Sequence, residues 1–133
     1  LQDIKEGKVL PEFFHDFDVA GAVLNLSMAM QTKVSFERAG MRKGLPIFVE
    51  GGFRKNDTYN SLVSTIYRDS QVSRTDLKEA SAFGAAMLGK AAVEGIDPKQ
   101  MQSLFTIEKK PVEAIELPGL DEYGEAFFDL MRS

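Results

Sequence analysis

The chain has 133 residues, 44% hydrophobic and 27% charged, proportions typical of a globular domain or part of one. Its net charge of -4, absence of cysteine and single histidine argue against a nucleic-acid surface, disulfides and a zinc site. No apolar stretch reaches the length of a membrane span and no signal-peptide pattern opens the chain, so we expect a cytoplasmic protein without nucleic-acid or membrane partners.

The first 42 residues predict a loop followed by a long helix. Residues 1–16 contain Pro11 and are expected to form a loop with a short helical turn. Because the chain starts at Leu1, not at methionine, we expect it to be the carboxyl-terminal part of a larger protein. Asp16 or Asp18 is expected to cap a helix that ends near Gly40 or Gly44. Its apolar residues recur near helical spacing: Val19, Val23, Leu26, Met30 and Val34.

A strand is expected next, over residues 45–49, which are too few for a helix and include a proline. Two glycines follow, and Asn56 with Asp57 has the chemistry that caps a helix. The helix after them has one apolar face, formed by Tyr59, Leu62, Val63, Ile66 and Tyr67. The sequence therefore predicts a strand, a glycine turn and an amphipathic helix in succession.

A second strand is predicted over residues 71–75, followed by another helix. Asp76 and Glu79 are spaced as a capping box, and Gly95 is expected to end the helix. Gly84 and Gly89 make the helix slim, and each mid-helix glycine costs about 1 kcal/mol relative to alanine. We therefore expect another backbone or a ligand to approach this helix closely.

The last part of the chain predicts a connection and a terminal helix. Asp97 and Pro98 fit the start of a short helix, and residues 105–120 are expected to be an extended connection. The apolar side of the terminal helix is formed by Tyr123, Phe127, Leu130 and Met131. The order helix, strand, helix, strand, helix and helical tail indicates an α/β fold. Two short strands leave helix faces uncovered, so we expect a missing part of the protein or a homodimer to cover them.

The segment from residue 47 to residue 56 holds the strongest functional signal. Gly51 and Gly52 end a strand without side chains that would block a flat or charged ligand. Ligands of open α/β sheets bind in crevices at the carboxyl ends of strands. The alternative is a tight strand-to-helix turn without a ligand.

Several motifs together resemble the carboxyl-terminal domain of FGGY carbohydrate kinases, which include glycerol, xylulose, rhamnulose and fuculose kinases. The resemblance covers residues 16–96 well and the tail loosely. Its motifs are residues 49–56, the helix from Tyr59 to Tyr67, and the stretch from residue 79 to residue 88 with its Gly-Ala-Ala. The spacing of the motifs in combination is specific, whereas a Gly-Gly pair alone is not.

The resemblance implies the carboxyl-terminal part of an RNase H-like domain of the actin-like ATPase fold. Residues 1–17 would be a lead-in, residues 18–96 the ATP-binding subdomain, and residues 97–133 a connection with a terminal helix. The complete enzyme would transfer a phosphoryl group from ATP, with Mg²⁺, to a hydroxyl of a ketose or polyol, and fuculose, rhamnulose or xylulose kinases are the preferred types.

Carried over by position, Gly51, Gly52 and Asn56 would bind the nucleotide. An asparagine amide offers the donor and acceptor that an adenine edge requires, and the following helix points its positive end toward this region. Residues 82–86 would pack behind the adenosine pocket. The catalytic aspartate and the phosphate-binding loop of the family lie upstream of this chain, so we expect the isolated chain to be inactive.

Phe53 departs from the family pattern, which usually has glycine or alanine there. Its ring would stack on adenine, turn into the core, or obstruct the site. Glu50 would contact ribose or a metal-bound water, although a hydrated strand end is the favoured reading. Arg54 and Lys55 would face phosphates or, as surface charges more often do, only solvent. For His15, next to Asp16, a surface or capping role is favoured over acid–base chemistry.

The rival hypothesis is a kinase-like module without catalysis that binds a partner protein through its exposed helices. The bulky Phe53 favours this alternative, because a ring at that position would hinder a nucleotide.

Overall fold

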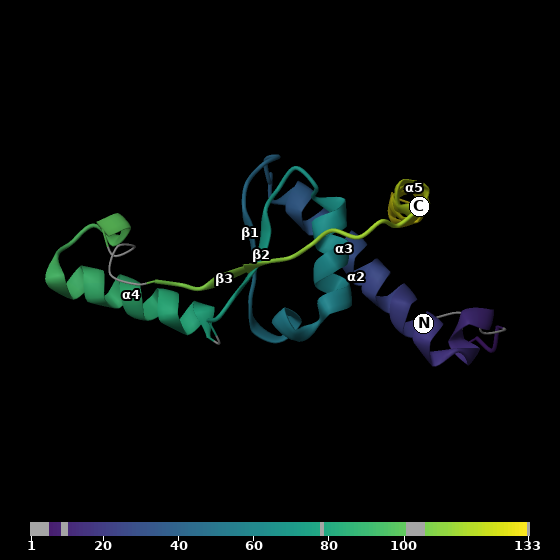
Figure 1. Ribbon diagram of the computed structural model, residues 1–133, viewed down its shortest axis with the longest axis horizontal. Helices are drawn as coiled ribbons and strands as arrows, with labels where there is room; N and C mark the ends of the chain where they lie inside the picture. The colour runs from purple at the N-terminus through teal and green to yellow at the C-terminus, as the bar shows by residue number, and fades with distance from the viewer. Residues whose placement is uncertain (1–5, 9–10, 78, 101–105, 133) are drawn as a thin grey trace. The chain divides into compact units, whose positions relative to one another are not determined.

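The computed structural model describes residues 6–8, 11–77, 79–100 and 106–132 (Figure 1). Contacts divide the chain into a helical unit, residues 1–40 and 118–133, and a sheet unit, residues 41–117. Two predicted features lie partly outside the described residues. The predicted capping box includes residue 78, and the loop predicted over residues 1–16 includes residues 1–5 and 9–10. The predicted division at residues 17 and 96 stays a prediction.

The helical unit contains the 3-10 helix η1, Glu12–His15, and the helices α2, Phe17–Arg38, and α5, Leu120–Arg132. Asp16 caps α2, because its Oδ1 accepts hydrogen bonds from the backbone N–H of Asp18 at 2.9 Å and of Val19 at 3.1 Å. The prediction of a cap by Asp16 is confirmed. Of the two predicted ends, the one near Gly40 is confirmed, since α2 ends at Arg38 and Gly40 follows with φ +72°, whereas Gly44 lies well beyond the helix.

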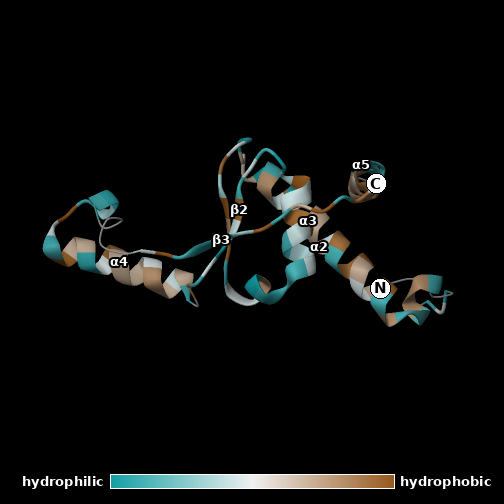
Figure 2. Ribbon diagram, viewed as in Figure 1, coloured by the Kyte–Doolittle hydropathy of each residue, from teal (hydrophilic) through white to brown (hydrophobic). Residues whose placement is uncertain are grey.

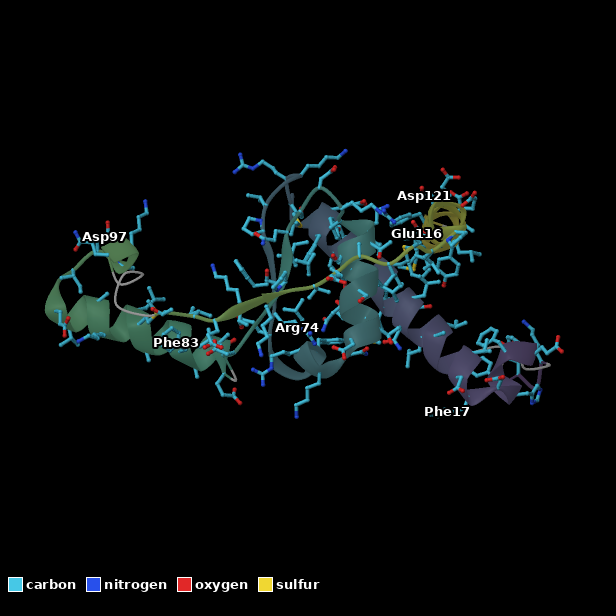
Figure 3. The ribbon with its side chains drawn as sticks, viewed as in Figure 1. Phe17, Arg74, Phe83, Asp97, Glu116 and Asp121 are labelled. Atoms are coloured by element: carbon cyan, nitrogen blue, oxygen red, sulfur yellow. The ribbon has the colours of Figure 1, made fainter. Side chains whose placement is uncertain are left out.

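Helices α2 and α5 contact each other through small and aromatic residues. Ser27 Oγ lies 3.3 Å from the hydroxyl of Tyr123. A Cβ added to Gly124 would meet the Met30 sulfur at 3.7 Å, so the methionine packs over this glycine. The residues predicted at the apolar side of α5 are therefore on a helix, as expected. In contrast, Phe17 at the first position of α2 is 90% exposed (Figure 3).

The sheet unit is built on three strands: β1, Ile47–Val49; β2, Val72–Thr75; and β3, Lys109–Pro111 (Figure 1). Their order is β1-β2-β3, with β1 parallel to β2 and β3 antiparallel to β2. Ile47 pairs with Val72, and Ser73 pairs with Pro111. Ile47 and Val49 are buried and Phe48 between them is exposed, the alternation expected of a strand.

The third strand lies in a segment that the sequence predicted to be an extended connection. Lys109, Lys110 and Pro111 are all exposed, so the strand has no apolar alternation by which it could be recognised. Proline is tolerated because β3 is at the edge of the sheet, where one row of backbone groups needs no partner. The expectation of only two strands was wrong for this reason.

Helix α3, Asp57–Ile66, lies between β1 and β2 in sequence and contributes Tyr59, Leu62 and Val63 to the buried apolar residues. Two of its polar residues hold the segment that leaves β3. Ser64 Oγ donates to the carbonyl of Val112 at 2.9 Å, and Thr65 Oγ1 accepts from the N–H of Ile115 at 2.9 Å. The predicted amphipathic helix is confirmed, and its polar side chains bind backbone groups 48 to 50 residues away.

Helix α4, Ala80–Glu94, ends at Gly95 in the left-handed conformation, as predicted. The predicted capping box does not form, since the capping residue is Glu79 and its side chain makes no cap hydrogen bond. No other backbone in the described part of the chain approaches these glycines, because a Cβ on Gly84 or Gly89 would meet no described atom within 4 Å, and the expected approach of a ligand stays a prediction. Small and apolar residues run along α4 (Figure 2), and Leu88 is 59% exposed.

The described residues thus form a mixed α/β structure with four α-helices and one three-stranded mixed sheet. The α/β class is confirmed, and the assignment to an RNase H-like fold stays a prediction. Residues 98–100 form a 3-10 turn that begins at Pro98, and residues 101–105, where a helix was expected to continue, lie outside the described residues. No helix in the described part of the chain is long and apolar enough to cross a membrane.

Candidate functional site

The candidate site is the bend between β1 and α3. The 3-10 helix η2, Gly51–Lys55, begins one residue after Glu50, and Asn56 both ends it and precedes α3. Gly51 has φ +64°, in the left-handed region that side chains with a Cβ rarely adopt. The chain reverses from strand to helix through this residue, so glycine is required there by the backbone.

Asn56 has a definite structural role at the start of α3. Its Oδ1 accepts a hydrogen bond from the N–H of Tyr59 at 3.0 Å, and its carbonyl accepts from the N–H of Asn60 at 3.0 Å. The side-chain oxygen therefore caps the helix by satisfying one of its free N–H groups.

Gly51 and Gly52 are exposed on the surface of the sheet unit. A Cβ added to either residue would meet no described atom within 4 Å. The bend is therefore open above both glycines, and neighbouring side chains do not cover it. Both residues lie where the sequence placed them, at the carboxyl end of β1.

Phe53 turns toward the first turn of α3. Its ring centroid lies 4.6 Å from that of Tyr59, with the planes at 41°, and 48% of the residue is exposed. The pair has the tilted geometry that aromatic rings favour. Of the three predicted positions for Phe53, the observed one is most similar to a ring turned into the core. The ring is only half-covered, however.

Glu50 and Arg54 connect the bend to β2. Glu50 Oε1 accepts a hydrogen bond from the hydroxyl of Thr75 at 3.2 Å. Arg54 Nη1 donates to the carbonyl of Thr75, the last residue of β2, at 3.3 Å and to that of Asp76, the next residue, at 3.0 Å. These contacts satisfy carbonyl groups at the end of the strand, and they hold the guanidinium of Arg54 against the protein.

A groove of about 470 Å³ lies beside the bend, between η2 and the strands β2 and β3. It is lined by four basic, three acidic and one hydroxyl side chain: Arg54, Lys55, Arg74, Lys110, Asp57, Asp76, Glu108 and Thr75. Of the residues predicted at the nucleotide site, Gly51, Gly52, Phe53, Asn56 and Glu50 are not among them. The groove and the open glycines are thus neighbouring but different surfaces.

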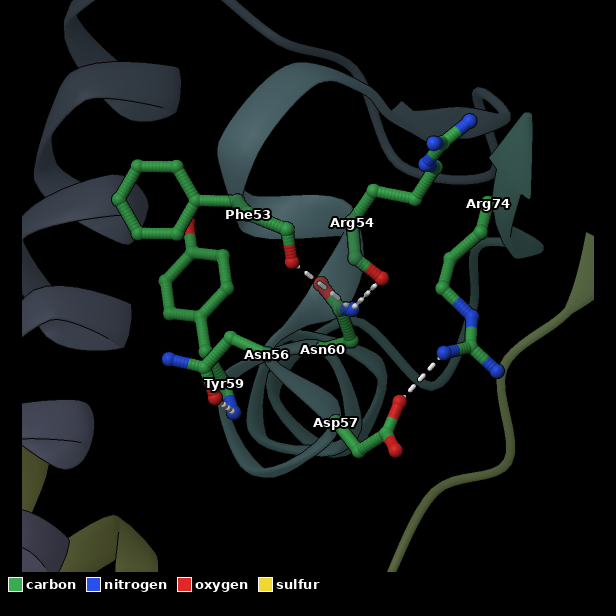
Figure 4. A network of polar contacts seen from close by, with 7 residues as sticks. All are labelled: Phe53, Arg54, Asn56, Asp57, Tyr59, Asn60 and Arg74. Carbon is green, nitrogen blue, oxygen red and sulfur yellow. Dashed lines mark hydrogen bonds and ion pairs between the residues drawn. The ribbon is translucent and has the colours of Figure 1, made fainter. Parts of the chain in front are cut away.

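The charges in the groove partly compensate one another. Arg74 forms an ion pair with Asp57, whose carboxylate is exposed (Figure 4). Arg54 is already engaged by two carbonyls, whereas Lys55 lines the groove from the last position of η2. The groove is therefore mixed in charge, and it lacks the uniformly basic lining that a phosphate cradle would have.

Our sequence analysis did not identify Asn60, whose side chain forms hydrogen bonds to the backbone of the bend. The residue is 1% exposed, and its Nδ2 donates to the carbonyls of Phe53 at 3.1 Å and Arg54 at 3.4 Å (Figure 4). Figure 4 shows Phe53 and Tyr59 on one side of it and Arg54 and Arg74 on the other. The sequence did contain one signal for this residue. Asn60 is a polar residue directly after Tyr59, on the side of α3 that is buried.

The remaining sequence candidates do not join this site. His15 ends η1 in the helical unit, where it is exposed and precedes the capping residue Asp16. Within the described ranges, no group of three or more histidine, cysteine, aspartate or glutamate side chains could hold a metal ion. The site in the sheet unit therefore consists of backbone, amide, aromatic and charged groups.

Comparisons with protein-family models, with curated proteins and with solved structures find no match to this chain. The resemblance to FGGY carbohydrate kinases accordingly stays a prediction from the motifs.

Proposed function

We propose that this chain is the nucleotide-binding carboxyl-terminal portion of an ATP-dependent carbohydrate kinase of the FGGY type. The observation that supports it best is the bend at the end of β1, where Gly51 and Gly52 are exposed, a Cβ on either would meet no described atom within 4 Å, and Asn56 caps the next helix. A flat ligand needs this kind of uncovered backbone to approach closely. A buried bend would have argued against the proposal.

In the proposed enzyme the bend supplies one wall of the adenosine pocket, and upstream parts of the protein supply the other wall, the catalytic aspartate and the sugar site. Bound MgATP supplies the phosphoryl group, which passes to a hydroxyl of a ketose or polyol. The residues described here orient the adenosine, and orientation together with charge neutralisation is the main requirement of phosphoryl transfer. The cytoplasm, where ATP and sugars are available, is the proposed location.

The groove beside the bend is not assigned to the phosphates in this proposal. Arg54 and Arg74 both have protein partners, and three carboxylates share the groove with them. Carboxylates next to a triphosphate would repel it. The favoured reading of Arg54 and Lys55 as residues without a phosphate role is therefore kept.

Replacement of Asn56 tests the proposal. In the complete enzyme, Asn56→Ala is expected to raise the KM for ATP and to leave the KM for the sugar nearly unchanged, because the proposal assigns this amide a contact with the nucleotide and none with the sugar. Steady-state kinetics with a panel of ketoses and polyols as acceptors measures both constants. An unchanged KM for ATP would contradict the role given to this residue.

Asn56→Asp is the matched control for helix capping. Aspartate caps a helix as well as asparagine does, whereas alanine costs about 1 kcal/mol of stability. The aspartate variant should keep the thermal stability of the wild type and still show the raised KM for ATP, since it lacks the amide donor. A wild-type KM for ATP in this variant would mean that Asn56 acts only as a cap.

The second candidate function is the module that binds a partner protein without catalysis. The exposed apolar residues of α4, with Leu88 at 59% and Val93 at 88% exposure, favour it. Calorimetric titration of the intact protein with MgATP separates the two hypotheses. The kinase hypothesis requires a saturable heat of binding, and the module without catalysis would give none.

A further inference from the structure

Asn60 is the most buried polar residue at the bend, and its side-chain hydrogen bonds among the described residues run to η2. Its Nδ2 donates to the carbonyls of Phe53 and Arg54, the third and fourth residues of that short helix. Both partners are acceptors, so the amide nitrogen, not the oxygen, must face them. A side chain from the first turn of α3 thus reaches back to the loop that leads into the helix.

The carbonyl of Phe53 is the point where these contacts meet. It also accepts a hydrogen bond from the N–H of Asn56 at 3.0 Å. Loss of the Asn60 amide would leave this second bond and the contact between the Phe53 and Tyr59 rings in place, but it would remove the side-chain hydrogen bonds from Asn60 to η2. The bend would then keep its local turn and lose its fixed position relative to the helix.

The oxygen of the same amide is an unusual feature. Asn60 Oδ1 is buried and has no hydrogen-bond partner within the described part of the chain. An unpaired buried acceptor opposes folding, so it offsets part of what the two donor bonds contribute. Stability therefore explains this asparagine poorly, and the geometry that its donor imposes on η2 explains it better.

We infer that Asn60 is a positioning residue for the proposed nucleotide site, an inference that rests on the proposed function. It holds the carbonyls of Phe53 and Arg54, and thereby sets where Gly51 and Gly52 present their backbone to adenosine. The residue itself is too buried to contact the ligand. Its effect on ATP affinity passes through the shape of η2.

The test is calorimetric titration of the complete enzyme with MgATP, before and after Asn60→Ala. The expected result is a rise of about tenfold in the Kd for MgATP, as for a site whose loop must be reordered on binding. Ser64→Ala is the matched control. Ser64 is also buried on α3 and also donates to a backbone carbonyl, that of Val112, so its loss should reduce stability without changing the Kd.

The outcomes separate the inference from the function on which it rests. If the wild type gives no heat with MgATP, the proposed function is contradicted. If the wild type binds and Asn60→Ala binds equally well, or if Ser64→Ala weakens binding as much, only the role of Asn60 is overturned. Should Asn60→Ala fail to fold, Asn60→Ser provides the same comparison, because its hydroxyl is too short to reach both carbonyls and a wild-type Kd would again overturn the inference.

Discussion

Gly51 and Gly52 are neighbours in the sequence, yet the backbone uses them differently. Gly51 has φ +64°, whereas Gly52 is not among the glycines with positive φ. A Cβ would find space at both positions, so crowding does not require either glycine. Backbone conformation explains the first glycine, and free access for a ligand is the proposed reason for the second.

This difference in backbone conformation predicts different changes in stability for the two alanine variants. Gly51→Ala should lower the free energy of unfolding by about 1–2 kcal/mol, the usual cost of a left-handed residue with a Cβ. Gly52→Ala should leave it nearly unchanged. Urea denaturation of both variants measures this. Under the proposed function, Gly52→Ala should nevertheless weaken MgATP binding, and equal losses of stability would contradict the assignment of the strain to Gly51.

At the scale of elements, the sheet unit is held together by contacts distant in the sequence. The segment after β3 is bound by polar side chains of α3, and all three residues of β3 are exposed. Thr65 is central, because its Oγ1 accepts from the N–H of Ile115 and its single proton lies within hydrogen-bond distance of the carbonyls of Ser61 and Ile115. A hydroxyl group of α3 therefore holds the segment that follows the edge strand.

Thr65→Val tests this link, because valine has nearly the same shape without the hydroxyl. The N–H of Ile115, a residue that is 41% exposed, would lose this partner, and the free energy of unfolding should fall by about 0.5–1.5 kcal/mol, the usual net contribution of a hydrogen bond. Thr65→Ser, which keeps the hydroxyl and loses a methyl group, should lose less. Urea denaturation measures both variants, and a valine variant as stable as the wild type would show that the hydroxyl bonds contribute nothing.

At the scale of the whole molecule, the described residues leave much apolar surface uncovered. Among the residues of α4 only Ala91 is buried, and Leu88 and Val93 are exposed. Slim helices with small residues allow close contact with another surface, but none of the described atoms is near Gly84 or Gly89. The proposed function accounts for this surface if the rest of the kinase covers it.

The proposal therefore predicts that the 133-residue chain alone has no kinase activity. The groups expected to carry out phosphoryl transfer, the catalytic aspartate and the phosphate-binding loop, lie outside it by resemblance. An assay of ADP release with MgATP and a panel of ketoses and polyols should give no turnover above background. Turnover by this chain alone would contradict the view that it holds only the adenosine side of the site.

The elements that the sequence predicted correctly are those whose signals are local. Asp16 and Asn56 cap α2 and α3 as their residue types indicated, and Gly95 ends α4 in the left-handed conformation. The capping box at Asp76 was wrong, although its spacing fits, since the N–H of Asp76 binds the carbonyl of Glu108 instead. A contact that is distant in the sequence overrode the local pattern in that case.

The sequence by itself determined the α/β order, the open glycine turn after β1 and the helix that Asn56 caps, because caps, glycines and apolar spacing act over a few residues. Only the tertiary structure decided the third strand, the groove between β2, β3 and η2, and the role of Asn60. Each of these depends on contacts between backbone groups that are several to tens of residues apart in the sequence. Every residue has a backbone carbonyl, so the type of a residue does not indicate whether its carbonyl accepts such a hydrogen bond.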